Sequence, residues 1–161
     1  MDDQATQAIG ATQERRALAV ARVVLGLMIF STFFENLHKG AYTAVGYKGV
    51  IDYYITKGTA PGIWKAIESV LASNAGVVAP LQAVGEFSMG VLLIVGLATR
   101  AVGLAAGAFL LSLWISELGT SWPWELAMYV VAAFVLAWAR AGRAWGVDAV
   151  LLRRNPGWRL G

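Results

Sequence analysis

Two charged side chains interrupt long apolar runs of the sequence. Arg22 lies within ALAVARVVLGLMIFSTFF, and Glu86 lies within VVAPLQAVGEFSMGVLLIVGLA. A charged group inside lipid costs several kcal/mol on insertion scales, so each needs a partner or a polar space. The long side chain of an arginine can extend to the lipid headgroups, which leaves a purely structural interpretation open for Arg22. A glutamate cannot extend as far, and Glu86 is therefore the first candidate for chemistry.

A polar cluster is predicted around Glu86. Gln82 precedes it by four residues, so both lie on one helical face, and the amide can hydrogen-bond the carboxyl group. Glu35 and His38 end the first apolar run, at the same depth if the two runs are antiparallel neighbours. A quinol that loses electrons also releases protons, which a carboxylate or an imidazole can accept. We expect Gln82, Glu86 and Glu35 to contact a quinone, with Glu86 and His38 as catalytic groups; alternatively, Glu35 and His38 are only solvated helix ends.

Other cofactors are disfavoured by residue types. The chain has no cysteine and one histidine, so we expect no metal, haem or iron–sulfur cluster. The net charge of +3 comes mostly from arginines at the ends of apolar runs, which indicates membrane topology and no nucleic-acid partner.

The elements that must position these residues are membrane helices. Of the 161 residues, 58% are hydrophobic and 14% are charged, so the chain needs lipid as its solvent. Crossing the hydrocarbon core takes about 20 apolar residues, and four runs approach that length: residues 17–34, 77–98, 101–118 and 122–139. We predict a single all-α domain over residues 1–161, an integral membrane four-helix bundle with a polar N-terminal tail (1–14) and a basic C-terminal tail (140–161).

Arginine placement predicts the orientation, because positively charged residues favour the cytoplasmic side. If the four runs alternate in direction, arginines of both tails and Arg100 share one side, so we expect a multi-pass protein of the cell membrane with both termini in the cytoplasm. In the third run, Gly103 and Gly107 form a GxxxG pair, which indicates close helix packing inside the bundle or a dimer contact.

The long connection between the first two runs is expected to fold. Its segment PGIWKAIESVLAS has helical periodicity, with apolar Ile63, Trp64, Ile67, Val70 and Leu71 on one face and Lys65, Glu68 and Ser69 on the other. We predict an amphipathic helix in this outer loop, which lies on the membrane surface or caps the bundle.

Two motifs resemble a known family. They are E-x-x-x-G-x-L-L-x-x-G-L-x-T-R, from Glu86 to Arg100, and the closing G-R-x-W-G-V-D, from Gly142 to Asp148. Together with ARVVLGLMIFSTFFENLHKG and ISELGTSWPWEL they make the chain similar to the DoxX-like family, and more closely to its DoxD branch, the small subunit of thiosulfate:quinone oxidoreductase. By position, Arg22 matches the basic residue of the family's first helix and Glu86 the acid of its second.

The resemblance implies a membrane subunit of a quinone-linked oxidoreductase that passes electrons from a sulfur compound to quinone, with a partner subunit. In that setting we count Arg22 among the catalytic residues, beside Glu86 and His38. The alternative is a non-catalytic accessory subunit that packs against a larger respiratory or photosynthetic complex, since the chain has no self-sufficient catalytic constellation.

Overall fold

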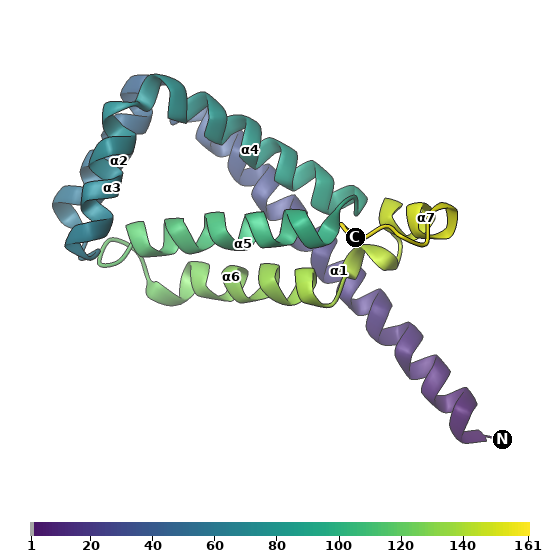
Figure 1. The fold of residues 1–161 in the computed structure, drawn as a ribbon. Coiled ribbons are helices and arrows are strands. Elements are labelled where there is room, and N and C mark those ends of the chain that lie inside the picture. The colour runs from purple at the N-terminus through teal and green to yellow at the C-terminus, as the bar shows by residue number, and fades with distance from the viewer. Residues whose placement is uncertain (1) are drawn as a thin grey trace.

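The structure is a computed structural model that describes the backbone of residues 2–161 and the side chains from residue 10 onward. All regular elements among the described residues are helices, and none is a strand (Figure 1). The elements are α1 (Asp2–His38), α2 (Ala44–Lys57), α3 (Gly62–Ser73), α4 (Ala75–Val95), α5 (Thr99–Ser116), α6 (Pro123–Trp138), the 3₁₀ helix η1 (Ala141–Arg143) and α7 (Val147–Arg154).

Three helices are long and apolar enough to cross a membrane: α1 from Gly10, α4 and α5. The first predicted span, 17–34, lies within α1, whereas the second and third, 77–98 and 101–118, extend two or three residues past the ends of α4 at Val95 and of α5 at Ser116. The fourth predicted span, 122–139, corresponds to α6, which is apolar but has only 16 residues. Residues 2–14 of the predicted polar tail continue α1 as helix, whereas residue 1 lies outside the described part of the chain.

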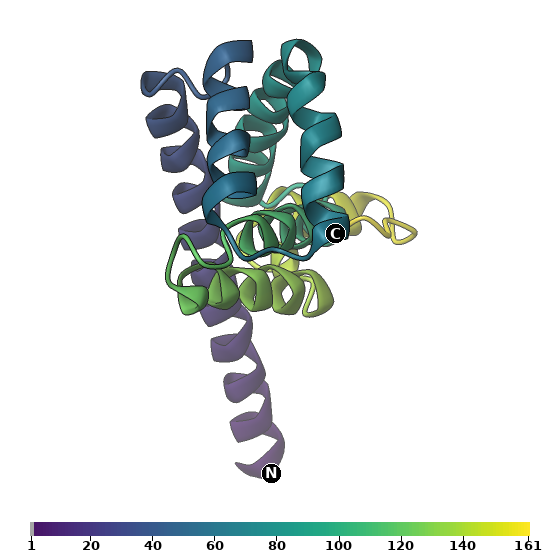
Figure 2. The ribbon, with the colours of Figure 1, turned by 90° about the vertical axis from the view of Figure 1, so that its left-hand side faces the viewer.

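The prediction of a four-helix bundle needs correction, because the helices form two splayed pairs. Helix α1 packs along α4, and α5 packs along α6, whereas few contacts join α4 to α5. The pairs converge near the C-terminus and diverge toward the other end, where α2 and α3 lie across the opening (Figures 1 and 2). The long connection between α1 and α4 therefore adds two helices, which lie at the separated ends of the pairs.

Glycines allow the helices of each pair to approach closely. A Cβ atom at Gly26 of α1 would meet the backbone of α4 at 2.9 Å, and one at Gly90 of α4 would meet Phe30 of α1 at 3.0 Å. In the other pair, Gly103 faces Ala137 and Gly107 faces the ring of Phe134. The predicted GxxxG pair thus serves packing inside the chain.

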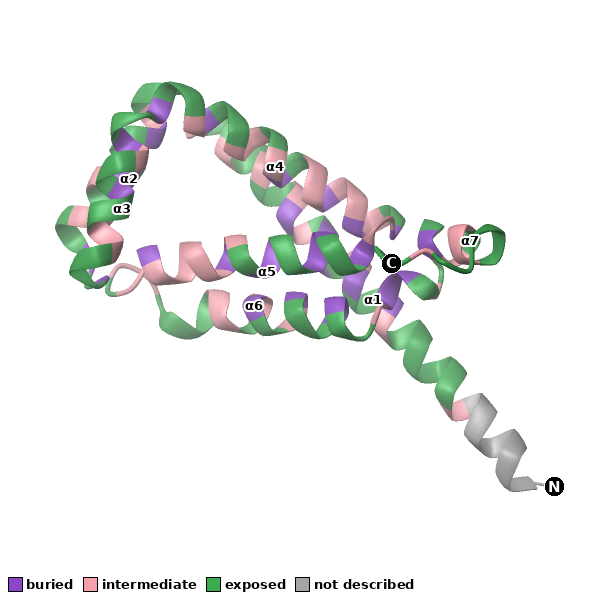
Figure 3. Cartoon of the chain, viewed as in Figure 1, coloured by how far each residue is buried: buried purple, intermediate pink, exposed green. Residues whose placement is uncertain are grey.

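The outer loop contains the predicted amphipathic helix as α3. Its apolar residues Ile63, Ile67 and Val70 are exposed, and Lys65 donates hydrogen bonds to the carbonyls of Ile55 and Gly58 at the end of α2. Lys65 and the buried Glu68 therefore face α2 and the interior, while Ile63, Ile67 and Val70 face outward. The predicted division into faces holds only in part, because Trp64 and Leu71 are half-buried and Ser69 is exposed. In contrast, residues 11–17 of α1 are all exposed, and this part of α1 extends away from the other helices (Figure 3).

The convergence point, which we call the vertex, contains two buried charges of opposite sign. Arg22 of α1 is fully buried and donates hydrogen bonds to the carbonyls of Ala141, Ala144 and Trp145, at 3.0, 3.2 and 3.2 Å. It therefore does not extend to the lipid headgroups, as one interpretation of the sequence held. Its guanidinium occupies the space that a Cβ atom at Gly96 or Gly146 would need.

Asp148 of α7 is the second buried charge and caps the N-terminus of α5. Its carboxylate accepts hydrogen bonds from the backbone N–H groups of Ala98 and Thr99, both at 2.8 Å, and from the indole of Trp158 at 2.9 Å. The next two amides, of Arg100 and Ala101, donate to the carbonyl of Leu160. The N-terminal amides of α5, which have no partner within the helix, are satisfied by the C-terminal segment.

We predict that Asp148→Asn lowers the free energy of unfolding by about 3 kcal/mol, because the new amide group would face a backbone N–H donor in a buried site. Thermal unfolding in detergent, followed by tryptophan fluorescence, measures the change. The control Asp52→Asn removes an exposed carboxylate paired with Lys48 and should cost no more than about 1 kcal/mol. Equal effects in the two variants would show that Asp148 does not organise the vertex.

Candidate functional site

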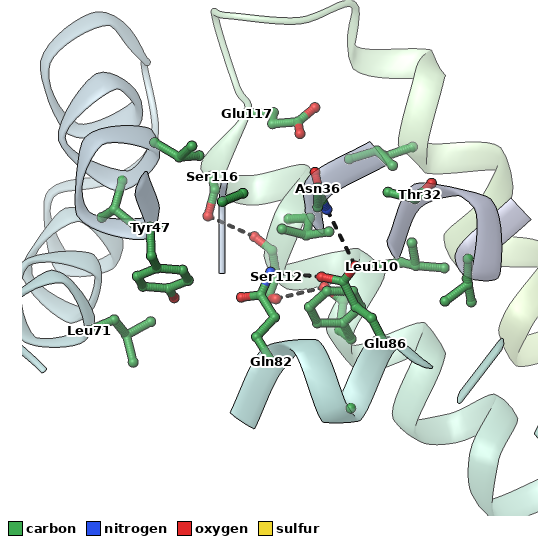
Figure 4. Close-up of a pocket in the computed structure, with 18 of the residues that line it drawn as sticks. Thr32, Asn36, Tyr47, Leu71, Gln82, Glu86, Leu110, Ser112, Ser116 and Glu117 are labelled. Atoms are coloured by element: carbon green, nitrogen blue, oxygen red, sulfur yellow. Dashed lines mark hydrogen bonds between the residues drawn. The ribbon is translucent and has the colours of Figure 1, made fainter. Parts of the chain in front are cut away.

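A cavity of about 640 Å³ lies between the diverging helix pairs and below α2 and α3 (Figure 4). Helices α1 through α6 all contribute to its lining, which is mostly apolar, with residues such as Ile29, Met89, Leu110 and Leu113. Ligand sites in proteins are concave, mainly apolar and marked by a few convergent polar groups. This cavity has that composition, and the polar groups decide what it can hold.

Glu86 is the central polar residue of the cavity. It is 2% exposed, and its Oε1 accepts a hydrogen bond from the Gln82 amide at 2.8 Å, as the four-residue spacing predicts. Its Oε2 accepts one from the Tyr42 hydroxyl at 2.5 Å and one from the Asn36 amide at 3.4 Å. Figure 4 shows Asn36 and Gln82 directed toward this carboxyl group. A carboxylate offers about four acceptor positions, so Oε1 keeps one for a ligand.

Tyr42 is held in place by aromatic packing. Its ring stacks on Phe33 at a centroid separation of 5.5 Å, and Phe33 in turn contacts Phe87 of α4 at 5.3 Å. Burial, with the hydrogen bond to Glu86 as a smaller cause, raises the pKa of the Tyr42 hydroxyl above its ordinary value. The hydroxyl therefore stays protonated and acts as a permanent donor to Glu86.

Glu68 of α3 also lines the cavity but, unlike Glu86, is not held by hydrogen bonds. It is 1% exposed, yet neither carboxyl oxygen has a hydrogen-bond partner among the described residues. Burial, and then the nearby Glu68 carboxyl group, raise the pKa of the Tyr47 hydroxyl above its ordinary value. Burying a carboxylate without a partner costs stability, so Glu68 makes the fold less stable than an apolar residue of similar size would.

A third carboxylate, Glu117, lines the cavity next to the junction of α2, α3 and α5. It accepts a hydrogen bond from the Tyr54 hydroxyl at 3.1 Å, while the Trp64 indole donates to Ser116 Oγ at 2.9 Å. None of the described residues that line the cavity is a lysine, arginine or histidine. The charge of the lining thus disfavours an anionic ligand and suits a neutral molecule that donates hydrogen bonds.

The structure brings together only part of the predicted site. Gln82 and Glu86 are hydrogen-bonded neighbours in the cavity. Glu35 is exposed and pairs with Lys39, and His38 is exposed in the last turn of α1; neither lines the cavity. Arg22 is at the vertex, bonded to backbone carbonyls. Catalytic roles for His38 and Arg22, and quinone contact by Glu35, stay predictions from the sequence.

Two site residues were not anticipated from the sequence. Tyr42 follows the end of α1, and nothing in a lone loop tyrosine indicates that it reaches Glu86, 44 residues away. Glu68 falls on the polar face of an amphipathic helix, where the periodicity indicates solvent. No signal in the sequence distinguishes Glu68 from Ser69, which lies on the same predicted face and is exposed.

We predict that Glu68→Met raises the free energy of unfolding by about 2 kcal/mol, because an apolar side chain of similar length removes a buried carboxyl group that has no partner. The matched variant Glu86→Met should lower it by a similar amount, since it leaves three donors unsatisfied. Thermal unfolding in detergent measures both. A loss of stability in Glu68→Met as large as that in Glu86→Met would contradict our description of Glu68.

The comparisons with known proteins find one match. The DoxX family model matches residues 17–119. This region is more than half of the chain and includes Arg22, Glu68 and Glu86. No curated protein and no solved structure matches the chain.

Proposed function

Because the chain belongs to the DoxX family, we propose that this multi-pass membrane protein is the quinone-binding subunit of a DoxD-like oxidoreductase. The observation that supports the proposal is the cavity: an apolar space of about 640 Å³ with one fixed carboxylate, Glu86, at its side. A quinone in its reduced quinol form has the same division, an apolar tail and a ring whose hydroxyl groups can donate hydrogen bonds to a carboxylate. The volume of the cavity lies within the usual range of small-molecule sites, roughly 300–1,000 Å³.

The residues of the cavity fit the quinone in a specific way. Gln82 and Tyr42 hold the carboxylate of Glu86 from both oxygens, so its direction is set before a ligand arrives. The remaining acceptor position on Oε1 can receive a ligand hydroxyl, and the carboxylate can take up or return the proton of that hydroxyl. A bound quinone supplies two-electron, two-proton redox chemistry. The apolar lining excludes water from the exchange.

The sulfur half of such a reaction is not assigned to this cavity. Thiosulfate is a dianion, and the described lining combines three carboxylates with no cationic side chain. Like charges would oppose its entry. We therefore propose that a partner subunit oxidises the sulfur compound and delivers the electrons, while this chain positions the quinone and its protons.

The accessory alternative has less support from the structure. A subunit that packs against a larger complex through glycine-lined faces needs those faces to be free. Gly26, Gly90, Gly103 and Gly107 all face helices of their own chain. A bound quinone in the purified chain would favour the quinone-binding proposal, whereas a complex that keeps full activity after removal of this chain would favour the accessory role.

We predict that Glu86→Gln weakens binding of the quinol form about tenfold, since the hydrogen bond from a quinol hydroxyl to a charged carboxylate contributes roughly 1.5–3 kcal/mol. A short-chain quinol, kept reduced and titrated into the purified chain, is detected by quenching of tryptophan fluorescence, because Trp64 lines the cavity. The control Glu125→Gln makes the same change at an exposed residue outside the cavity and should bind as the wild type does. Equal affinity of Glu86→Gln and the wild type would refute the role of Glu86.

A second variant tests the cavity without removing a polar group. Gly85 lines the cavity, and a Cβ atom there has no heavy atom within 4 Å. We predict that Gly85→Leu fills the ligand space and weakens quinone binding at least about tenfold, while the helix gains up to about 1 kcal/mol from the loss of glycine. Gly76→Leu, on the same helix and equally unhindered but outside the cavity lining, is the control. Undiminished binding in Gly85→Leu would place the quinone elsewhere.

A further inference from the structure

A second cavity, of about 370 Å³, lies at the end of the helices where the arginines gather, which we call the arginine cleft. Four arginines line it: Arg15 of α1, Arg140 just before η1, Arg143 in η1, and Arg153 of α7. It is separate from the large cavity, with which it shares no lining residue.

The positive charge of the arginine cleft is not neutralised by the described chain. No acidic residue lines it, and the ion pairs among the described residues, Lys39–Glu35 and Lys48–Asp52, involve none of its arginines. The nearby acid Asp148 is occupied by Ala98, Thr99 and Trp158.

The arginines of the cleft also repel one another. Partial desolvation is the largest cause that lowers the pKa of the Arg143 guanidinium, and the positive charges of Arg140 and Arg15 lower it further. Arginines that only set membrane orientation need to be on one side of the membrane, and repulsion would spread them apart. Here the fold instead brings four of them around one concave space, so the arrangement lacks a negative partner.

The other walls of the arginine cleft are apolar. Leu18 of α1, Leu152 of α7 and Trp138 at the end of α6 line it, and Trp138 is 91% exposed. Exposed tryptophans at the ends of apolar helices are typical of the membrane interface. The cleft thus combines cationic groups with apolar surface at the level where lipid headgroups lie.

We propose that the arginine cleft binds the phosphate headgroup of an anionic phospholipid. Guanidinium groups contact phosphate oxygens in bidentate fashion, and basic pockets between membrane helices are suited to anionic lipid headgroups. The volume accommodates a headgroup, and the apolar wall of Leu18, Trp138 and Leu152 lies where the first part of an acyl chain would run. Such a lipid would connect α1, α6 and α7 next to the vertex.

Native mass spectrometry of the full chain, titrated with phosphatidylglycerol or phosphatidylcholine in detergent, tests the proposal. We expect the wild type to retain one phosphatidylglycerol in preference to phosphatidylcholine. The variant Arg143→Gln/Arg153→Gln should bind phosphatidylglycerol about tenfold or more weakly. The control Arg154→Gln/Arg159→Gln removes the same charge from exposed residues outside the cleft and should keep the lipid. The unfolding temperature in phosphatidylcholine verifies that both variants fold.

Three outcomes would overturn the proposal. Equal losses in the two double variants would indicate a diffuse charge effect, and no preference for phosphatidylglycerol in the wild type would exclude an anionic headgroup site. Inorganic phosphate is added in a third series. Displacement of the lipid by inorganic phosphate at matched concentration would identify the occupant as a free anion instead of a lipid.

Discussion

Arg22 places a positive charge at the point where the two helix pairs converge, and backbone carbonyls replace water as the hydrogen-bond partners of its two terminal nitrogens. Three carbonyls from the segment between α6 and α7 accept its hydrogen bonds, and the buried carboxylate of Asp148 is near enough to attract it. Removing one partner from a buried charge costs several kcal/mol, roughly 3–5. The C-terminal segment must therefore fold back onto α1, where it also satisfies the first amides of α5.

This fixed vertex determines the rest of the architecture. Glycines allow α1 to pack closely along α4 and α5 along α6, and the two pairs contact each other less than the helices within each pair do. At the far ends the pairs separate, and α2 and α3 close the space. The result is a cavity with mostly apolar walls, to which α3, α4 and the C-terminal cap of α5 contribute the carboxyl groups Glu68, Glu86 and Glu117.

Features that the lipid environment or local helical spacing imposes could be predicted from the sequence, whereas features set by contacts between distant residues could not. Apolar run length identified the three helices that are long enough to cross the membrane, although it also predicted a fourth span where α6 has only 16 residues. Helical spacing identified the hydrogen bond between Gln82 and Glu86. The splayed arrangement could not be predicted, because no local pattern says whether helix pairs stay parallel. Neither could the partners of Arg22, which lie about 120 residues away, nor the burial of Glu68.

The central claim is that the cavity beside Glu86 holds a quinone, and photoaffinity labelling tests it most directly. An azido-quinone is bound to the chain in proteoliposomes, irradiated, and the labelled peptides are mapped by mass spectrometry. Our account predicts labels on lining residues of α1, α4 and α5 near Glu86, and their loss when an excess of unmodified quinone competes. Labels confined to the lipid-facing residues, unaffected by the competitor, would contradict it.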